Sequence, residues 1–291
     1  LGIGNLKRKG RIISSAFEHP AVEECLKVLE KTFEIIRLRP VNGQILPEQV
    51  ESALTPDTVL VSLMQVNNET GAVTDLRKIR QILHRTASSA LLHTDAVQGF
   101  LKEEPIYSVV DMASFSGHKT HAPKGIGALY LKKGLHLPPF VRGGGQEKGL
   151  FSGTSNTPAA AAWGKACRIL TPKWREHRSQ AEKVCRTFWT GLEALGAKVL
   201  SPRLSNPYVL SFAFPGYLGE NILHALSARE IYLSTGSACS SRKASTVMKA
   251  IGQEAMSRFA LRASFSFETT QEEALQTLDS LKDILGSLRK V

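Results

Sequence analysis

Three segments of the sequence end in unusually polar groups of residues, each directly after a run typical of a buried β-strand. The groups are Asn67-Asn68-Glu69, His93-Thr94-Asp95 and Ser116-Gly117-His118-Lys119. In open α/β sheets, ligands bind beyond the carboxyl ends of the strands. A single aspartate or lysine in such a place is usually a helix cap or a surface charge, but polar groups at successive strand ends indicate a shared site.

An aspartate and a lysine on neighbouring strand ends can perform one demanding task together. The Asp95 carboxylate can keep a pyridinium nitrogen protonated, and the Lys119 amine can form a Schiff base with a cofactor aldehyde. This is the layout of pyridoxal-phosphate sites, in which the cofactor ring accepts electrons. Ser116 and His118, just before the lysine, are placed to bind the phosphate group.

A further candidate is a cysteine in a segment with almost no residue that could fill a core. In LSTGSACSSRK, residues 233–243, Cys239 stands among glycine, alanine, serines and a threonine, with Arg242 and Lys243 close behind. Nearby positive charge favours the thiolate, which is the nucleophilic form. Gly236 and its small neighbours predict a loop that can swing.

The elements that must position these residues alternate between β-rich runs and amphipathic helices, as in an α/β domain with a mainly parallel sheet. The sequence predicts strands at 11–17, 33–41, 58–66, 90–98 and 109–119, an antiparallel strand at 125–133, and helices at 21–32, 46–54 and 75–86.

The second half of the chain has a different pattern, that of a smaller α+β region. Helices are predicted at 159–170, 174–195, 219–228 and 272–288, and strands at 207–214, 230–234 and 259–267. Thr269 and Thr270, each three residues before a glutamate (Glu272 and Glu273), predict a capping box at the start of the last helix.

The chain resembles the group I (NifS/IscS-like) cysteine desulfurases of the class V aminotransferase superfamily in the segments EHPAV, VNNE, HTDAVQ, SFSGHK, APKGIGALY, GGGQEKGLFSGTSNT, STGSACSS and ALRAS. The match runs over essentially the whole chain, in the same order. It implies a fold-type-I pyridoxal-phosphate-dependent transferase. Residues 1–155 would form a large domain with a mainly parallel sheet of the seven-stranded type, and residues 156–291 a smaller α+β domain carrying the cysteine loop.

The resemblance implies a role in cofactor binding for five residues. Lys119 would form the Schiff base, and Asp95 would pair with the pyridine nitrogen. Gln98 would donate a hydrogen bond to the ring hydroxyl. His19 would stack on the ring and assist proton transfers, and Asn68 would lie near the ring hydroxyl and the substrate.

For the phosphate and the substrate, the resemblance implies a second set of roles. Ser116 and His118 would hold the phosphate, and Thr154 would reach the phosphate of the other subunit in a homodimer. Arg262 would bind the substrate carboxylate, a role that suits its bidentate guanidinium. Cys239 would be the nucleophile.

The implied reaction converts L-cysteine to L-alanine and leaves a persulfide on Cys239. The sulfur would then pass to an iron–sulfur scaffold or another acceptor protein, or to tRNA thiolation. The four dispersed cysteines, without a CxxC pair, predict no metal site of their own and a reducing, cytoplasmic compartment. Cys239 could still contact an iron–sulfur cluster during transfer.

Four of these residues also have a purely structural interpretation. His19 could simply precede a helix, Arg262 could form an internal ion pair, and Asn68, with Asn67, could serve a turn. Thr154 could cap a helix.

The whole chain has alternative interpretations as well. A selenocysteine lyase or another class V lyase or aminotransferase would use the same cofactor residues. A non-catalytic remnant, or an interaction module with a basic surface, would use none of them. The formal net charge is +11, but the basic residues are scattered and form no nucleic-acid motif, which argues against direct nucleic-acid binding. No apolar run is long enough to span a membrane.

The sequence departs from the family pattern in three places. The Asn-Ala-Ala-Thr run and the Gly-Ala-Thr phosphate loop that open the family's domain are absent, so we expect an N-terminally truncated fragment whose own cofactor affinity is open. Phe151 replaces the arginine usual before SGT. Ser266-Phe267 replaces a Gly-Arg pair after Arg262.

Overall fold

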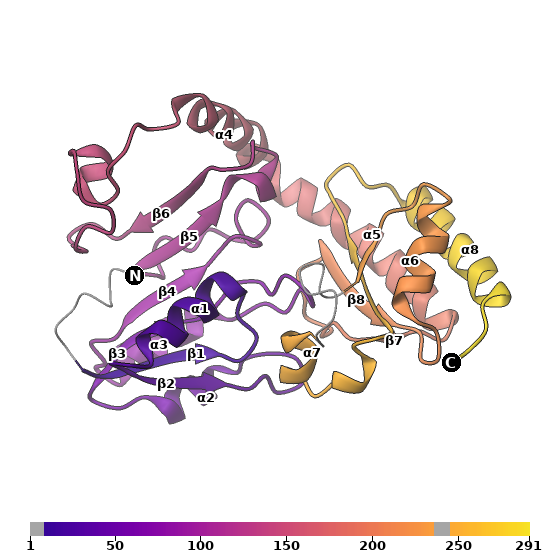
Figure 1. The fold of residues 1–291 in the computed structure, drawn as a ribbon, viewed down its shortest axis with the longest axis horizontal. Helices are drawn as coiled ribbons and strands as arrows, with labels where there is room; N and C mark the ends of the chain where they lie inside the picture. Colours follow the sequence, from indigo (N-terminus) through magenta and orange to yellow (C-terminus); the bar gives the residue numbers. More distant parts are fainter. Residues whose placement is uncertain (1–8, 236–244) are drawn as a thin grey trace. The chain divides into compact units, whose positions relative to one another are not determined.

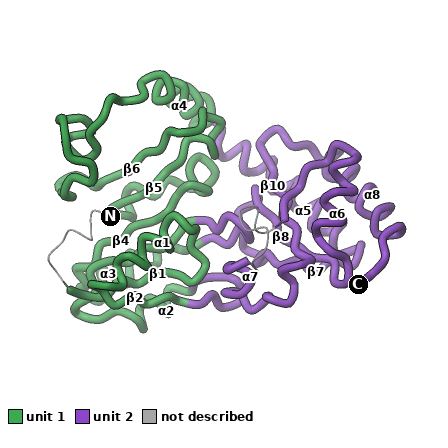
Figure 2. The backbone as a smooth tube through the Cα atoms, in the orientation of Figure 1, with its two compact units in different colours: residues 1–38, 46–65, 74–172 green, residues 39–45, 66–73, 173–291 purple. Residues whose placement is uncertain are grey.

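The chain forms two compact units in the computed structural model, which describes residues 9–235 and 245–291 (Figures 1 and 2). The first unit comprises Leu1–Leu38, Leu46–Gln65 and Thr74–Pro172, and the second comprises Arg39–Ile45, Val66–Val73 and Lys173–Val291. Two short stretches from the N-terminal half therefore belong to the second unit. The domain division expected at residue 155 stays a prediction.

The first unit contains a mixed, mostly parallel sheet with the strand order β2-β1-β3-β4-β5-β6. The first five strands in this order are parallel, and β6 runs antiparallel to β5 as expected. The strands are β1 (Arg11–Ser15), β2 (Glu34–Leu38), β3 (Thr58–Ser62), β4 (Leu91–Asp95), β5 (Met112–Ser116) and β6 (Gly127–Leu131). The described residues thus give six strands, one fewer than the seven-stranded type expected, because the sequence holds only six strand-like runs before residue 155.

The central strands of this sheet are buried on both faces. Residues of α1 pack on one face, where Leu26 joins Ile12, Leu60 and Met112 in a buried cluster. The next residue along each of four strands is also fully buried: Ile13, Val61, Leu92 and Ala113. Because side chains alternate along a strand, these residues point to the opposite face. Burial on two faces explains the near-continuous apolar strand sequences.

The helices of the first unit begin and end at recognisable signals. Pro20 occupies the first turn of α1, and the buried residues Leu76, Ile79, Ile82 and Leu83 form one stripe of α3. The helices are α1 (Pro20–Leu29), α2 (Pro47–Ala53), α3 (Leu76–Arg85) and α4 (Thr157–Leu170), with a short 3₁₀ helix at Gly117–Thr120 directly after β5.

The second unit is built on an antiparallel sheet with the order β7-β8-β10-β9. Its strands are β7 (Lys198–Val199), β8 (Val209–Ala213), β9 (Ser234–Thr235) and β10 (Ala260–Ser264). Its helices are α5 (Trp174–Ala194), α6 (Gly219–Ser227), α7 (Thr246–Ala250) and α8 (Gln271–Ser287).

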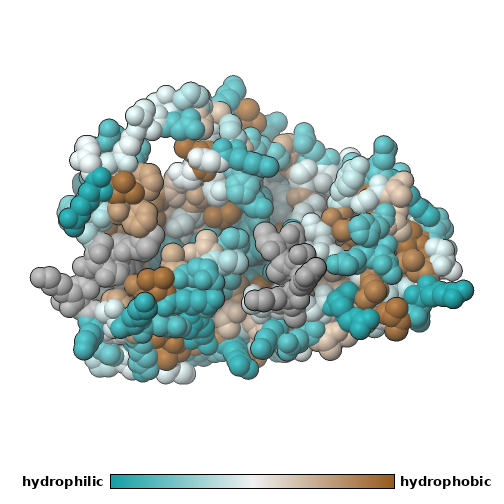
Figure 3. All heavy atoms as spheres, viewed as in Figure 1, coloured by the Kyte–Doolittle hydropathy of each residue, from teal (hydrophilic) through white to brown (hydrophobic). Residues whose placement is uncertain are grey.

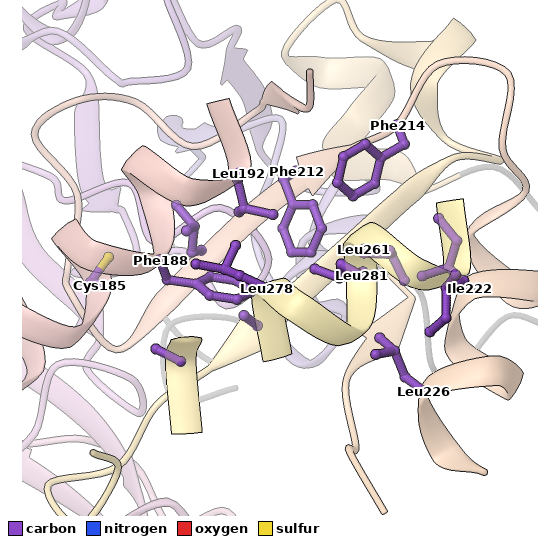
Figure 4. Close-up of a cluster of buried hydrophobic side chains, with 14 of the residues drawn as sticks. Cys185, Phe188, Leu192, Phe212, Phe214, Ile222, Leu226, Leu261, Leu278 and Leu281 are labelled. Carbon is purple, nitrogen blue, oxygen red and sulfur yellow. The ribbon is translucent and has the colours of Figure 1, made fainter. Parts of the chain in front are cut away.

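Aromatic and aliphatic side chains from helices and strands form the core of the second unit (Figure 4). Phe188 of α5 meets Phe212 of β8 edge to face, with ring centroids 5.9 Å apart. Leu278 and Leu281 of α8 complete this cluster. The buried side of α5 therefore packs on one face of the antiparallel sheet. This agrees with the expected α+β architecture.

The prediction of a strand at 230–234 is wrong for most of these residues. Only Ser234 and Thr235 pair with β10, as β9. The apolar residues that suggested a strand are not all buried, since Tyr232 is 76% exposed. The capping box predicted for the last helix is confirmed: Thr270 Oγ1 accepts a hydrogen bond from Glu273 N, and Glu273 Oε2 accepts one from Thr270 N.

Hydrophilic residues cover much of the face drawn in Figure 3, with smaller groups of hydrophobic residues between them. Among the described residues, no helix has both the length and the apolar character needed to cross a bilayer.

Candidate active site

Asp95 ends β4 in a buried position at the carboxyl edge of the parallel sheet. Its Oδ1 accepts a hydrogen bond from Val97 N at 2.9 Å, and no donor from the described residues reaches Oδ2. Burial raises the pKa of Asp95, while the Val97 hydrogen bond and the nearby charge of His19 oppose that shift. A buried carboxylate with one oxygen left open suits a cationic N–H partner.

Lys119 lies on the neighbouring strand end. β5 pairs with β4 in parallel, with Asp95 opposite Ser114, and β5 runs directly into the 3₁₀ helix that contains Lys119. This turn is held by Thr120, whose Oγ1 donates to Gly117 O and accepts a 2.9 Å hydrogen bond from Trp163 of α4. The structure therefore brings the two sequence-predicted chemical groups to one edge of one sheet.

Ser116 and His118 lie together beside this lysine. Ser116 Oγ and His118 Nδ1 are 2.8 Å apart. Partial burial lowers the pKa of His118, and the positive charges of Lys119 and Lys124 act in the same direction. A hydroxyl and an imidazole with two ammonium groups nearby form a donor set that suits an anion such as a phosphate.

His19 has the structural place that one of its two interpretations gave it. It caps α1, and its Nδ1 accepts a hydrogen bond from Ala21 N at 3.1 Å. The charge of His19 also acts on Asp95, which places the imidazole near that carboxylate.

Glu18, next to His19, is a buried carboxyl that the sequence analysis did not identify. Its Oε1 accepts hydrogen bonds from Ser15 Oγ at 2.5 Å and from Met64 N at 3.0 Å, and its Oε2 is buried without a partner among the described residues. Burial raises the pKa of Glu18 to about 8, and the negative charge of Asp95 contributes to this rise. No periodicity marks a glutamate in a loop as buried, so no local pattern could have identified this residue.

Gln98 and Thr154, the other two residues predicted in this unit, lie on turns. Gln98 is partly exposed in the turn after β4. Thr154 is exposed before α4, and it does not cap that helix. The cap is Asn156, whose Oδ1 accepts a hydrogen bond from Ala159 N at 3.2 Å.

Asn68 and Arg262 lie in the second unit and contact each other. Arg262 Nη1 donates to the backbone oxygen of Asn68 at 3.0 Å. Asn67, by contrast, is a structural turn residue, since its Oδ1 accepts hydrogen bonds from Glu69 N, Thr70 N and Thr70 Oγ1. Cys239 and its neighbours Arg242 and Lys243 lie outside the described residues.

Glu69 is a second buried carboxyl that the sequence analysis did not assign. Its Oε2 accepts a 2.6 Å hydrogen bond from Ser245 Oγ. Burial raises the pKa of Glu69, and the hydrogen bond from Ser245 and the charge of Arg262 oppose that rise. Its place in the VNNE segment, in the polar group after a predicted strand, was the available signal.

Comparison with known proteins identifies the group to which the chain belongs. The family described as aminotransferase class-V matches residues 1–276. A NifS/IcsS protein homolog of Lactobacillus delbrueckii subsp. bulgaricus is 39% identical over 295 residues, which covers 96% of this chain and 75% of that protein. The cysteine desulfurase IscS of Acinetobacter baumannii strain AYE is 36% identical over 296 residues, covering 97% of this chain and 72% of the relative.

A solved structure shows that the likeness extends to the fold. A NifS-like protein superimposes with a TM-score of 0.89 and 35% sequence identity, covering 97% of this chain and 77% of the other. This chain therefore spans about three quarters of the length of these relatives. From the family match, the identities and the shared fold, it follows that the chain belongs to the class V aminotransferase family, within its NifS/IscS cysteine desulfurase group.

Proposed function

We propose that this chain is a pyridoxal-phosphate-dependent cysteine desulfurase that moves sulfur from L-cysteine to Cys239. The family depends on this cofactor. One observation carries the proposal for this chain: the buried, half-satisfied carboxylate of Asp95 ends the strand beside the one that leads to Lys119. That pair fits a protonated pyridine nitrogen and an aldehyde, as the donor set at Ser116 and His118 fits a phosphate.

Each of several residues of the first unit would bind a different part of the cofactor. Lys119 would hold its aldehyde and Asp95 its ring nitrogen, with Gln98 at the ring hydroxyl. Ser116 and His118 would bind its phosphate. When bound, the cofactor supplies an electron sink for the substrate carbon atoms.

Other residues would act at the rim of the cofactor. His19 would stack on the ring, and Asn68 would lie near its hydroxyl. In a homodimer, the exposed Thr154 would reach the phosphate held by the partner subunit. Thr154 is available for this role because Asn156 already caps α4.

The residues near the substrate would carry out the chemistry. Arg262 would bind the carboxylate of cysteine, and the Lys119 amine would move the proton at the substrate Cα, assisted by His19. The Cys239 thiolate attacks the substrate sulfur, so that an S–S bond forms as the Cβ–S bond breaks. The carbon fragment gains a proton and leaves as L-alanine. Atoms and electrons balance without an external oxidant or reductant.

The persulfide on Cys239 would then be delivered to an acceptor, either an iron–sulfur scaffold or another protein, including one of a tRNA-thiolation route. We place this activity in the cytoplasm, since four widely spaced cysteines without a CxxC pair suit a reducing compartment.

Three single variants of the full chain, loaded with pyridoxal phosphate, test the proposal. Cys239→Ala should keep the cofactor's visible absorption and a borohydride-fixed adduct on Lys119, but its alanine and sulfide formation from cysteine should fall to background. Lys119→Ala should lose the adduct. Cys25→Ala, which changes a partly buried thiol on α1, should match the unaltered chain in both respects.

The outcomes separate the alternatives. Sulfide release from cysteine at the normal rate by Cys239→Ala contradicts the nucleophile assignment. Alanine formation by that variant from selenocysteine but not from cysteine favours a selenocysteine lyase. A chain that never takes up the cofactor favours a non-catalytic remnant or an interaction module.

A further inference from the structure

The strand β3 loses one of its two neighbours close to the proposed cofactor site. It lies between β1 and β4 in the sheet (Figure 1), and β1 ends at Ser15. The chain after β3 continues beside β4, where Gln65 N donates to Asp95 O at 2.9 Å. Because backbone N–H groups alternate between the two sides of a strand, the N–H of Met64 points to the side on which β1 has ended.

The Glu18 carboxyl supplies the acceptor that β1 does not provide there. Its Oε1 accepts a hydrogen bond from Met64 N at 3.0 Å and another from Ser15 Oγ at 2.5 Å. A buried backbone N–H needs an acceptor, because leaving it unpaired costs about as much as a lost hydrogen bond. One carboxyl group therefore takes the place of a ladder partner and ties the turn after β1 to the end of β3.

The same turn carries His19 to the start of α1. His19 follows Glu18 directly, and its Nδ1 accepts a hydrogen bond from Ala21 N at 3.1 Å. The charge of His19 acts on Asp95. Glu18 Oε1 and Asp95 O bond the N–H groups of two consecutive residues, so these two oxygens lie within roughly 10 Å of each other. The anchor of the turn and the end of β4 are thus close together.

The surroundings of Glu18 favour its neutral form. The residue is 5% exposed, and its Oε2 is buried without a partner among the described residues. Both donors to Oε1 are uncharged. Two negative charges act on the carboxyl: Asp95 at the end of β4, and Glu23 of α1, which pairs with Arg37 of β2. A buried carboxylate without a cationic partner is unfavourable, so burial raises the pKa of Glu18 to about 8.

We propose that Glu18 is a positioning residue of the cofactor site, because its neutral carboxyl fixes the turn that presents His19 beside Asp95. This rests on the proposed function, since it assumes that His19 and Asp95 both contact pyridoxal phosphate. With the proton on Glu18, the negative charge of the two carboxyl groups stays on Asp95, where a protonated ring nitrogen requires it. Neighbouring carboxyl groups in different surroundings commonly divide their roles in this way.

The test compares Glu18→Gln, Glu18→Ala, His19→Ala and the double variant Glu18→Ala/His19→Ala. Each full chain is freed of cofactor and titrated with pyridoxal phosphate. Glutamine keeps the acceptor oxygen and has an N–H in place of the Oε2 proton, whereas alanine removes both. Glu24→Ala on the same helix is the matched control, since this glutamate is exposed and pairs with the exposed Lys27.

The affinities at pH 7 test whether Glu18 acts through His19. Glu18→Gln should bind the cofactor within about twofold of the unaltered chain, because it copies the neutral side chain. Glu18→Ala should bind about tenfold more weakly, as the loss of hydrogen bonds would give. The double variant should stay within about twofold of His19→Ala, because both substitutions remove the same contact with the ring. Glu24→Ala should match the unaltered chain.

The pH dependence of the affinity is a readout that a merely structural role would not change. Glu18 is about nine-tenths protonated at pH 7 and about one-tenth protonated at pH 9. Because the neutral form holds the turn, the affinity of the unaltered chain should fall about tenfold more than that of Glu18→Gln between these pH values. The titrating groups that both chains share cancel in this comparison.

A second measurement needs neither the cofactor nor activity. Hydrogen exchange of the Met64 amide, followed by NMR, reports on the bond to Glu18. At pH 7 this amide should exchange about fivefold faster or more in Glu18→Ala than in the unaltered chain, and Glu18→Gln should stay within about twofold. The Leu92 amide is the internal standard, since it donates to the unaltered carboxylate of Asp111 in the same sheet.

Met64 exchange that Glu18→Ala leaves unchanged overturns the proposal, and so does an additive loss of affinity in the double variant. Parallel pH profiles of the unaltered chain and Glu18→Gln overturn it as well, and this comparison remains decisive if Glu18→Ala does not fold. An unaltered chain that binds no pyridoxal phosphate shows instead that the proposed function is wrong. Met64 exchange then still decides whether Glu18 holds the turn, so the two failures are distinguishable.

Discussion

At the scale of single residues, burial is the main influence on the pKa values of three carboxyl groups. Asp95, Glu18 and Glu69 all have a raised pKa, with burial as the largest cause in each case. The three groups differ in the interactions that oppose this rise in pKa. Asp95 has one backbone donor and a nearby histidine, whereas Glu69 has a hydroxyl and a guanidinium. Glu18 has only neutral donors and a second carboxylate close by, so its pKa rises to about 8 and the group is driven towards the protonated state at neutral pH.

The Glu18→Gln variant should change how stability depends on pH. The pKa of Glu18 is about 8 in the folded chain and near its ordinary value of 4.5 when unfolded. Between these values the folded state binds more protons than the unfolded state, so the free energy of unfolding falls as pH rises. The slope due to this group approaches 1.4 kcal/mol per pH unit, about the value of one full proton. Above pH 8 it flattens.

Urea unfolding at several pH values between 5 and 8.5, for the unaltered chain and for Glu18→Gln, measures this difference. The variant should gain stability relative to the unaltered chain as pH rises through that window. Glu48→Gln, which alters an exposed carboxyl on α2, provides the control and should run parallel to the unaltered chain. Parallel curves for Glu18→Gln would mean that Glu18 is ionised in the fold.

At the scale of elements, the start of a helix removes one of two interpretations of Thr154 and leaves the other as a prediction. The sequence leaves Thr154 either as a phosphate-binding residue or as a helix cap. The structure gives the cap of α4 to Asn156, through its 3.2 Å hydrogen bond from Ala159 N. Pro158 follows in the first turn, where its missing N–H costs nothing.

Substitutions at these two positions should therefore separate stability from function. Asn156→Ala should lower the free energy of unfolding by about 1 kcal/mol, the usual cost of a lost cap. Thr154→Ala should leave stability within about 0.5 kcal/mol, as for most surface changes. Thr154→Ala should instead weaken cofactor binding, measured by titration of the apo chain with pyridoxal phosphate. A larger loss of stability in Thr154→Ala than in Asn156→Ala would contradict this assignment.

The elements were largely predictable because their sequences carry strong local signals. The strands β1, β3, β4 and β5 of the first sheet are β-rich runs with buried residues on both faces, and α3 has a clear apolar stripe. The exception at 230–234 shows the limit of such signals. Its apolar and aromatic residues favour a strand, yet pairing with β10 begins only at Ser234. Strand formation there depends on a partner distant in sequence, which no local pattern reports.

The candidate site was predictable only in part, for a similar reason. Asp95, Ser116 and Lys119 could be found because each follows a strand, and parallel strand ends meet at one edge. Glu18 and Glu69 could not, because burial of a loop carboxyl is decided by tertiary contacts such as those with Met64 and Ser245.

At the scale of the whole molecule, the two compact units are not continuous stretches of the chain. Segments 39–45 and 66–73 come from the sequence of the first sheet but belong to the second unit. Gly71 joins the second of these segments to its own unit, because its backbone oxygen accepts a 2.7 Å hydrogen bond from the buried Asn206. Domain boundaries predicted from the sequence divide the chain into continuous segments. They therefore could not assign these two stretches to the second unit.

Gly71 is expected to be indispensable to this arrangement. Its φ of +71° lies in the left-handed region, and an added Cβ would lie 2.6 Å from the backbone oxygen of Val209, which has no room to move as a side chain would. Gly196, which follows α5, has a similar φ of +80° but open space around its Cα. An alanine at either position would have the same unfavourable backbone conformation. Only an alanine at position 71 would also clash with the backbone.

Gly196→Ala should cost about 1 kcal/mol of unfolding free energy, the lower end of the penalty for a left-handed residue. Gly71→Ala should cost about 3 kcal/mol or more, because the backbone must also shift to relieve the clash. Since that shift moves the loop carrying Asn68, Gly71→Ala should also raise the KM for cysteine, whereas Gly196→Ala should leave it unchanged. Urea unfolding and steady-state alanine formation measure the two effects. Equal losses of stability in the two variants would show that the segment 66–73 is not held as tightly within the second unit as its contacts indicate.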